Sequence, residues 1–93
     1  MNAISITYTD ANLRILVEEY IAMQRSEFTL KGVCTYILYR AMEDDKTANN
    51  GIYESNQLEQ KDSKRVSVIL DKIATEGRIA CSNDNSQYMK LND

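Results

Sequence analysis

Few side chains in this sequence are suited to catalysis or metal binding. The chain has no histidine, so it lacks the commonest general base and the commonest transition-metal ligand. Cys34 and Cys81 lie far apart, and neither has a Cys-x-x-Cys partner, which argues against a zinc site. Asp44 and Asp45 are direct neighbours whose side chains would point apart, so they make a poor acid–base pair. We therefore predict a protein that is not an enzyme and that needs no metal and no cofactor.

The composition and the N-terminus are typical of a cytoplasmic protein. No apolar stretch approaches the roughly 20 residues that cross a bilayer, so we expect no membrane partner. Residues 1–10, MNAISITYTD, lack the basic and apolar blocks of a signal peptide. In a reducing cytosol we expect the two cysteines to be small buried apolar residues. A disulfide between Cys34 and Cys81 remains an open alternative.

Charge is distributed unevenly along the chain. The formal net charge is −3; residues 1–60 hold five basic and nine acidic side chains, and residues 61–93 hold six basic and five acidic ones. The acidic part centres on Glu43–Asp45, and the small basic cluster is Lys61, Lys64 and Arg65. This cluster is weaker than the basic stripe of a committed nucleic-acid-binding protein, but it holds the residues best suited to bind phosphate.

The first half of the chain predicts a short strand and two helices within one domain spanning residues 1–93. Residues 3–8, AISITY, alternate as a strand does, so residues 1–9 form an N-terminal strand or arm whose partner is distant or on another chain. Apolar residues at helical spacing predict a helix over 10–25, capped by Thr9 or Asp10. The same pattern predicts a second helix over 30–43, capped by Thr29.

The second half predicts a loop, a third helix and a hairpin. Residues 44–61 show no period and form a long loop, either functional or with a helical turn near 54–60. The third helix is expected to start at Asp62 or Ser63 and to end at Gly77, which suits the left-handed conformation. Two short strands over 78–81 and 87–91, joined by a polar tip at 82–86, follow it.

This order, together with the stretch "V..IL.KIATEGRI" and the ending "YMKL", resembles winged helix-turn-helix domains of the MarR-like and ArsR-like regulators. The resemblance implies an α+β fold of three helices, a C-terminal two-stranded wing over 78–92 and a short N-terminal strand. The sequence departs from the family pattern at 44–61, where a turn of about 3–4 residues is usual. The N-terminal strand is an addition, and no dimerising helix follows the wing.

The resemblance implies a cytoplasmic transcription regulator that binds duplex DNA as a homodimer. In the third helix the outward side would hold most of the DNA contacts, and the wing would add others. The expected DNA-binding residues are Lys61, Ser63, Lys64, Arg65, Ser67, Val68, Lys72, Arg78, Asn83, Asn85 and Lys90. Asp71, in the middle of the same arc, would repel phosphate, and the lysines could equally be a solvated helix face.

Two further expectations concern partners. For the homodimer, the expected interface comprises Ile4, Ile6, Tyr8, Ile15 and Tyr39, with the N-terminal strands of two copies pairing antiparallel. The alternative function is a winged-helix protein–protein interaction module without DNA binding, an adaptor or a mobile-element protein that acts on a host complex. The acidic 43–45 turn and the exposed tyrosines favour that alternative.

Overall fold

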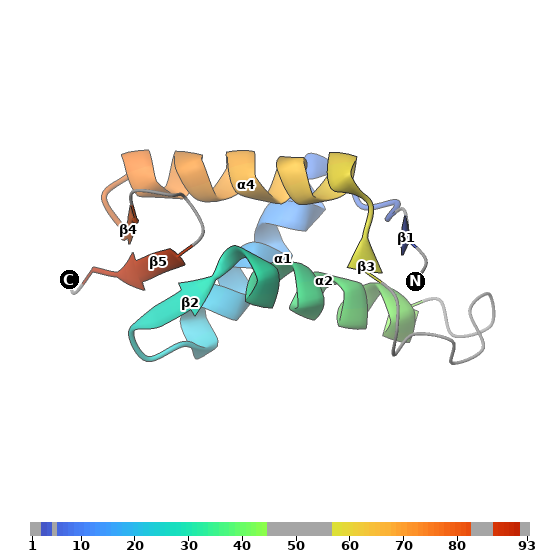
Figure 1. Ribbon diagram of the computed structural model, residues 1–93, viewed down its shortest axis with the longest axis horizontal. Helices are drawn as coiled ribbons and strands as arrows, with labels where there is room; N and C mark the ends of the chain where they lie inside the picture. The colour runs from blue at the N-terminus through green and yellow to red at the C-terminus, as the bar shows by residue number, and fades with distance from the viewer. Residues whose placement is uncertain (1–2, 5, 45–56, 83–86, 92–93) are drawn as a thin grey trace.

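The computed structural model of the chain describes residues 3–4, 6–44, 57–82 and 87–91. These residues form an α+β arrangement in which α1 (Asp10–Met23), α2 (Leu30–Asp44) and α4 (Gln60–Thr75) surround a small core. The strands are β1 (Ala3–Ile4), β2 (Glu27–Thr29), β3 (Gln57–Leu58), β4 (Ile79–Cys81) and β5 (Gln87–Lys90). In Figure 1, α4 lies along one side of the molecule, and the two sheets lie near its opposite ends.

The helices form where apolar periodicity and capping predict them. The Thr9 hydroxyl accepts a hydrogen bond from the Asn12 amide at 3.2 Å, and the Thr29 hydroxyl accepts one from Gly32 at 2.9 Å. Each cap satisfies an amide that has no partner within the first turn of its helix. Gly77 follows α4 with φ of 83°, the left-handed conformation expected of it. Both predicted helices of the first half, and both predicted caps, are therefore confirmed.

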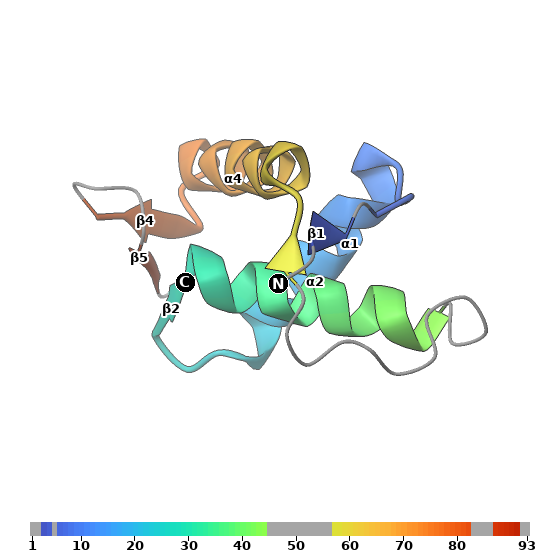
Figure 2. The ribbon, with the colours of Figure 1, turned by 45° about the vertical axis from the view of Figure 1, so that its right-hand side comes forward.

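The C-terminal hairpin belongs to a three-stranded antiparallel sheet rather than to a two-stranded wing. The strand order is β2-β5-β4, with Phe28 opposite Tyr88 and Cys81 opposite Tyr88 on the other side. The predicted break between the first two helices supplies the extra strand, because Glu27–Thr29 is extended and lies beside β5. Figure 2 shows this sheet at the end of the helices, next to the C-terminus of α4.

The core contains one face of each helix and the inner face of the sheet. Its fully buried members include Leu13, Val17, Ile37, Leu70 and Ile73. From the sheet, Phe28, Ile79 and Tyr88 are buried, and the rings of Phe28 and Tyr88 stack with centroids 5.5 Å apart. Burial of these apolar side chains is the main favourable term in the stability of the fold.

The partner of the N-terminal strand lies on the same chain. β1 pairs in parallel with β3, with Ala3 opposite Gln57 and Ile4 opposite Leu58. The long segment 44–61 therefore ends in a strand and in the first turn of α4; its residues 45–56 lie outside the described part of the chain. This internal pairing removes the reason for expecting β1 to pair with a second copy.

The start of α4 differs from the prediction. The helix begins at Gln60, with Glu59 as its N-cap residue and no side-chain cap, so neither Asp62 nor Ser63 is the cap. Asp62 is instead 1% exposed, and its carboxylate accepts a hydrogen bond from the Ile6 amide at 3.1 Å. A buried carboxylate needs such partners to offset its lost hydration, so Asp62 fastens the N-terminal arm to α4.

Candidate nucleic-acid interface

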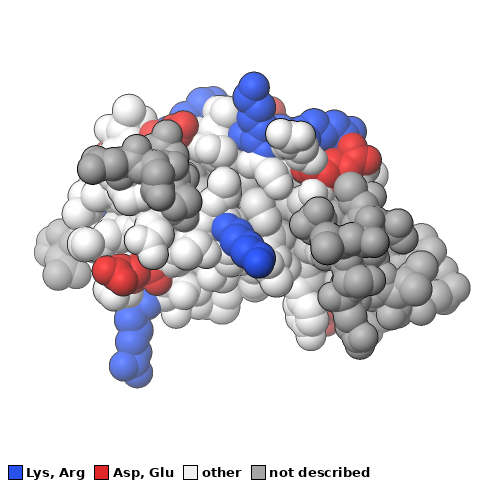
Figure 3. Space-filling view, viewed as in Figure 1, with Lys and Arg blue, Asp and Glu red and all other residues white. Residues whose placement is uncertain are grey.

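The outward side of α4 is the candidate site that the fold leaves open. Val66, Ile69, Leu70 and Ile73 face the core, so the 100° step of the helix turns another set of residues to solvent. That set forms what we name the α4 outer face: the exposed residues Lys61, Lys64, Val68, Asp71, Lys72 and Thr75. Basic side chains with some acidic ones between them stand along the upper edge of Figure 3, where α4 lies in Figure 1.

The three lysines of the α4 outer face have no ion-pair partner within the described part of the chain. Lys61, Lys64 and Lys72 are exposed, and every ion pair formed by described residues uses an arginine. A hydrated ammonium group on a flexible stem can reach a phosphate without giving up an existing contact. The structure thus places these three predicted residues on one exposed side of α4.

Arg65, predicted to bind DNA, is held within the protein instead. Its guanidinium contacts Asp10 at 2.8 Å and Asp62 at 3.1 Å, and it donates to the backbone oxygen of Tyr8 at 2.7 Å. The hydrogen bond to Asp10 is the main cause that raises the pKa of Arg65 above its usual value. The helix turns this side chain toward α1 and the N-terminal arm, which argues against the predicted contact of Arg65 with DNA.

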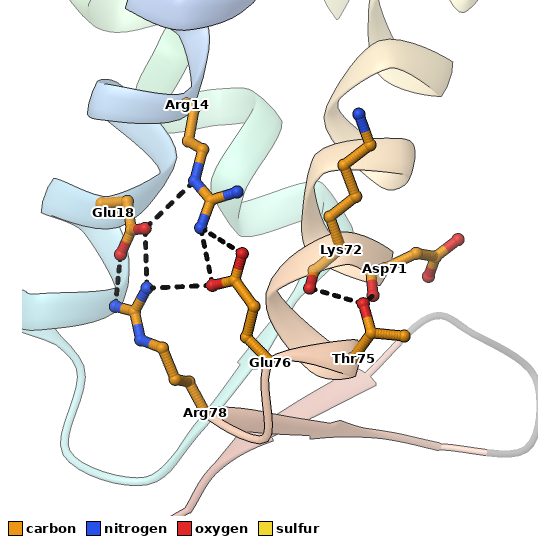
Figure 4. Close-up of polar contacts among 7 residues, drawn as sticks. All are labelled: Arg14, Glu18, Asp71, Lys72, Thr75, Glu76 and Arg78. Carbon is orange, nitrogen blue, oxygen red and sulfur yellow. Dashed lines mark hydrogen bonds and ion pairs between the residues drawn. The ribbon is translucent and has the colours of Figure 1, made fainter.

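Arg78 is also held by ion pairs within the protein. It forms an ion-pair network with Glu18, Glu76 and Arg14, which joins α1, the end of α4 and the start of β4 (Figure 4). Arg14 contacts Glu76 at 2.7 Å, and Arg78 bonds both oxygens of the Glu18 carboxylate. The hydrogen bond from Arg78 lowers the pKa of Glu18. This network closes the junction between the elements and leaves Arg78 little freedom to contact DNA.

Three further predicted DNA-binding residues have partners inside the protein. Ser63 lies 3.7 Å from the Cys34 sulfur, and Ser67 is hydrogen-bonded to the buried Tyr88 hydroxyl. The Lys90 ammonium donates to the backbone oxygen of Gln24 at 3.0 Å. These contacts engage the three side chains within the protein. The predicted wing residues Asn83 and Asn85 lie outside the described residues.

The predicted dimer residues differ in exposure, because some of them pack against the rest of the chain and others face solvent. Ile6 is 7% exposed and belongs to the core, and Tyr8 is partly buried against that core. Ile4 lies in β1, whose backbone is paired with β3. The burial of Ile6 and the pairing of the β1 backbone argue against the N-terminal strand as a dimer surface. Ile15 and Tyr39 are 55% and 60% exposed and remain open, but they stand on different helices.

Sequence patterns did not identify two residues that shape the site. Asp62 holds the arm and Arg65 together, and its only signal is an acidic residue three positions before an arginine. Tyr88 is 1% exposed, and burial raises its pKa to about 12. Met89 and Leu91 share one side of the β5 segment but are both exposed, whereas Tyr88, directly before Met89, fills the core.

The α4 outer face combines three lysines, one aspartate, a valine and a threonine. Among the described residues, no cluster of acidic or cysteine side chains could hold a metal ion, and both cysteines are free thiols. Within the same part of the chain, no helix has the length and apolar character needed to cross a membrane. Comparison with protein-family models, with curated proteins and with solved structures gave no match for this chain.

Proposed function

We propose that the chain is a winged-helix protein that binds duplex DNA through the α4 outer face and regulates transcription. The order of elements supports the fold: helix, strand, helix, helix and hairpin, with the first strand joined to the hairpin in the sheet β2-β5-β4. In that arrangement the third helix would be the recognition helix, whose exposed side enters the major groove.

The observation that carries the proposal is that arginines form the ion pairs of the described residues, whereas the lysines of α4 are exposed to solvent. Arg14, Arg40, Arg65 and Arg78 each contact a carboxylate of the same chain. The lysines of the α4 outer face, on one helix side, lack such partners among the described residues. Phosphate contacts supply most of the affinity of a protein for DNA in the absence of base contacts, and these lysines are the groups free to make them.

The net charge of −3 does not oppose this proposal. Five carboxylates, those of Asp10, Glu18, Glu19, Asp62 and Glu76, are paired with four arginines, which offset most of their charge. The field at the DNA depends on the local surface more than on total charge. On the α4 outer face three lysines outnumber the single carboxylate of Asp71. We expect weak binding to random DNA and a strong dependence on salt.

The test is fluorescence anisotropy of a labelled duplex titrated with protein at several salt concentrations. The variant Lys61→Ala with Lys64→Ala removes two charges from the α4 outer face. The matched control, Arg25→Ala with Lys31→Ala, removes two exposed charges from other elements. Each lost phosphate contact reduces the slope of log K against log salt by about 0.9, so the lysine variant should lose roughly 1.8 from the slope.

The control variant should keep the slope of the wild-type protein, and circular dichroism should show both variants folded. Equal loss of affinity in the two variants would mean that binding follows total charge rather than the α4 outer face. A wild-type protein that fails to bind duplex DNA at low salt would refute the proposal outright.

Self-association forms a second part of the proposal, because winged-helix regulators bind two half-sites about one duplex turn apart. Ile15 and Tyr39 are the predicted dimer residues that remain exposed. Sedimentation equilibrium measures the mass directly, and Ile15→Glu and Tyr39→Glu tested singly would identify the helix involved. A wild-type protein that stays monomeric at high micromolar concentration would remove this part.

A specific surface favours a protein partner as the second candidate function. The outer side of the sheet carries exposed Met89 and Leu91. Beside them, Glu27, Ala80 and Gln87 help line a shallow, mostly apolar groove of about 140 Å³. Exposed apolar patches of this kind occur at protein contact sites. Capture of a defined partner that is lost in Met89→Asp, with no affinity for DNA, would favour this function over the first.

A further inference from the structure

We infer that Val68 contacts a thymine methyl group in the major groove, so that the protein prefers duplexes with thymine at the centre of its site. This inference rests on the proposed function and specifies which DNA that function selects. Its starting point is an apolar side chain, 46% exposed, in the middle of the otherwise polar α4 outer face. A single exposed valine is ordinary by itself, so its meaning depends on its neighbours.

Val68 lies midway between two lysines that have no ion-pair partner among the described residues. Lys64 is four residues before it and Lys72 four residues after it, so all three share one side of the helix. The two lysines are separated by about 12 Å along the axis at 1.5 Å per residue. The major groove is about 12 Å wide. A recognition helix lies within this groove, so the short Val68 side chain in the middle of the exposed side would face the base edges, while the longer lysine side chains before and after it could reach phosphates.

The chemistry of the groove floor determines what Val68 can contact. Base edges in the major groove present hydrogen-bond donors and acceptors, and the thymine C5-methyl is their apolar group. Valine offers no hydrogen bond, so the methyl is its complementary partner. In a helix a valine side chain is held largely in one rotamer. The buried residues Ile69 and Leu70 fix the helix behind it, so the contact needs little ordering.

Asp71 supports placing this part of the helix over bases rather than over the backbone. Its carboxylate is exposed three residues after Val68, where it would be repelled by a phosphate rim. Over the groove floor the same carboxylate can accept a hydrogen bond from the amino group of cytosine. A thymine with a nearby cytosine is therefore the base pattern that fits the centre of the α4 outer face.

The experiment compares thymine with uracil, because deoxyuridine lacks only the methyl group and keeps the base pairing. Duplexes are first selected from a randomised thymidine pool with the wild-type protein. The best duplex is then synthesised with thymidine or with deoxyuridine, and both affinities are measured by anisotropy. Loss of a buried methyl should weaken wild-type binding roughly threefold to fivefold per contact. Val68→Ala should weaken binding to the thymidine duplex and bring the ratio of the two affinities close to one.

The matched control is Met23→Ala, which removes exposed apolar atoms from α1, away from the α4 outer face. Because Met23 lies outside the proposed DNA-binding surface, the ratio should stay at its wild-type value. Equal wild-type binding to both duplexes, or a Val68→Ala protein that keeps the preference, would overturn this inference alone. Failure to bind either duplex at low salt would overturn the proposed function as well.

Discussion

Arg65→Ala should destabilise the protein strongly, although Arg65 is on the surface and follows the exposed Lys64. The substitution removes a guanidinium that contacts Asp62, Asp10 and the Tyr8 backbone oxygen. Asp62 is 1% exposed, so its carboxylate would lose its cationic partner while remaining buried. Breaking a buried ion pair by removing one partner costs about 3–5 kcal/mol. The Arg65 side chain is 32% exposed, which favours the lower end, about 3 kcal/mol.

This loss is large relative to the stability of a small domain, which is commonly about 5–15 kcal/mol. With a urea slope near 1.2 kcal/mol per molar, a loss of about 3 kcal/mol lowers the unfolding midpoint by roughly 2.5 M. The assay is urea unfolding followed by circular dichroism at neutral pH. Lys64→Ala is the matched control, since it removes the same charge one residue earlier and should change stability by about 0.5 kcal/mol or less.

A second variant identifies the source of the loss. Asp62→Asn keeps the size of the side chain but removes the buried charge, so Arg65→Ala should cost less in that background than in the wild type. The difference is the coupling energy of a double-mutant cycle. If Arg65→Ala and Lys64→Ala unfold at the same urea concentration, or if the coupling is zero, Arg65 does not compensate a buried charge and the reasoning fails.

Three further predictions concern the core and the titrating groups. Ile69→Ala should lower the free energy of unfolding in urea by about 2–4 kcal/mol because Ile69 is buried, whereas Val68→Ala should change it by about 0.5 kcal/mol or less. Equal losses of stability in the two variants would contradict the assigned helix face. Burial raises the pKa of Tyr88 to about 12, so the neutral phenol contributes roughly 2–3 kcal/mol to the free energy of unfolding below pH 10, and this contribution is lost as pH rises toward 12. Tyr88→Phe should therefore lose less stability at alkaline pH than the wild type, and an unchanged alkaline profile would refute this prediction. The hydrogen bond from Arg78 is the main cause that lowers the pKa of Glu18. The ionised Glu18 therefore stabilises the folded protein above the pKa of the unfolded state, and this stabilisation is lost as pH falls through the folded pKa. In thermal melts, Glu18→Gln should show a smaller decrease in melting temperature on acidification than the wild type.

Helices were predictable because their signal is repeated along the chain. Leu13, Leu16, Val17 and Ile21 recur at helical spacing and are all buried, and the periodicity is reinforced by caps at Thr9 and Thr29. Each helix therefore offers many residues that agree with one another. The hairpin had less support, and its pairing with a third strand was missed because Glu27–Thr29 is too short to show alternation.

The candidate site was only partly predictable because ion pairing depends on tertiary structure. Lys64 and Arg65 are adjacent and carry the same charge, so sequence alone grouped them as one basic cluster. The folded chain separates them, since Arg65 meets Asp10, which is 55 residues away in sequence, while Lys64 stays exposed. The hydrogen bond from Ile6 to Asp62 spans 56 positions. No local pattern encodes a contact of that separation.

The chemistry of the two basic residue types explains why arginines form the ion pairs and lysines occupy the exposed side of α4. A guanidinium is planar, weakly hydrated and able to bond a carboxylate through two nitrogens, which suits the crowded junctions where Arg14, Arg65 and Arg78 connect α1, α4, the arm and the sheet. An ammonium group is strongly hydrated and keeps its freedom on a solvent-facing helix side. Glu18, Glu19 and Glu76 thus help to hold the elements together. Among the described residues, the cations that form no ion pair are Arg25, Lys31, Lys90 and the three lysines of the α4 outer face. Of these, only the three on α4 share one side of a helix. This is why the salt dependence of DNA binding should change with Lys61 and Lys64 and not with Arg25 and Lys31.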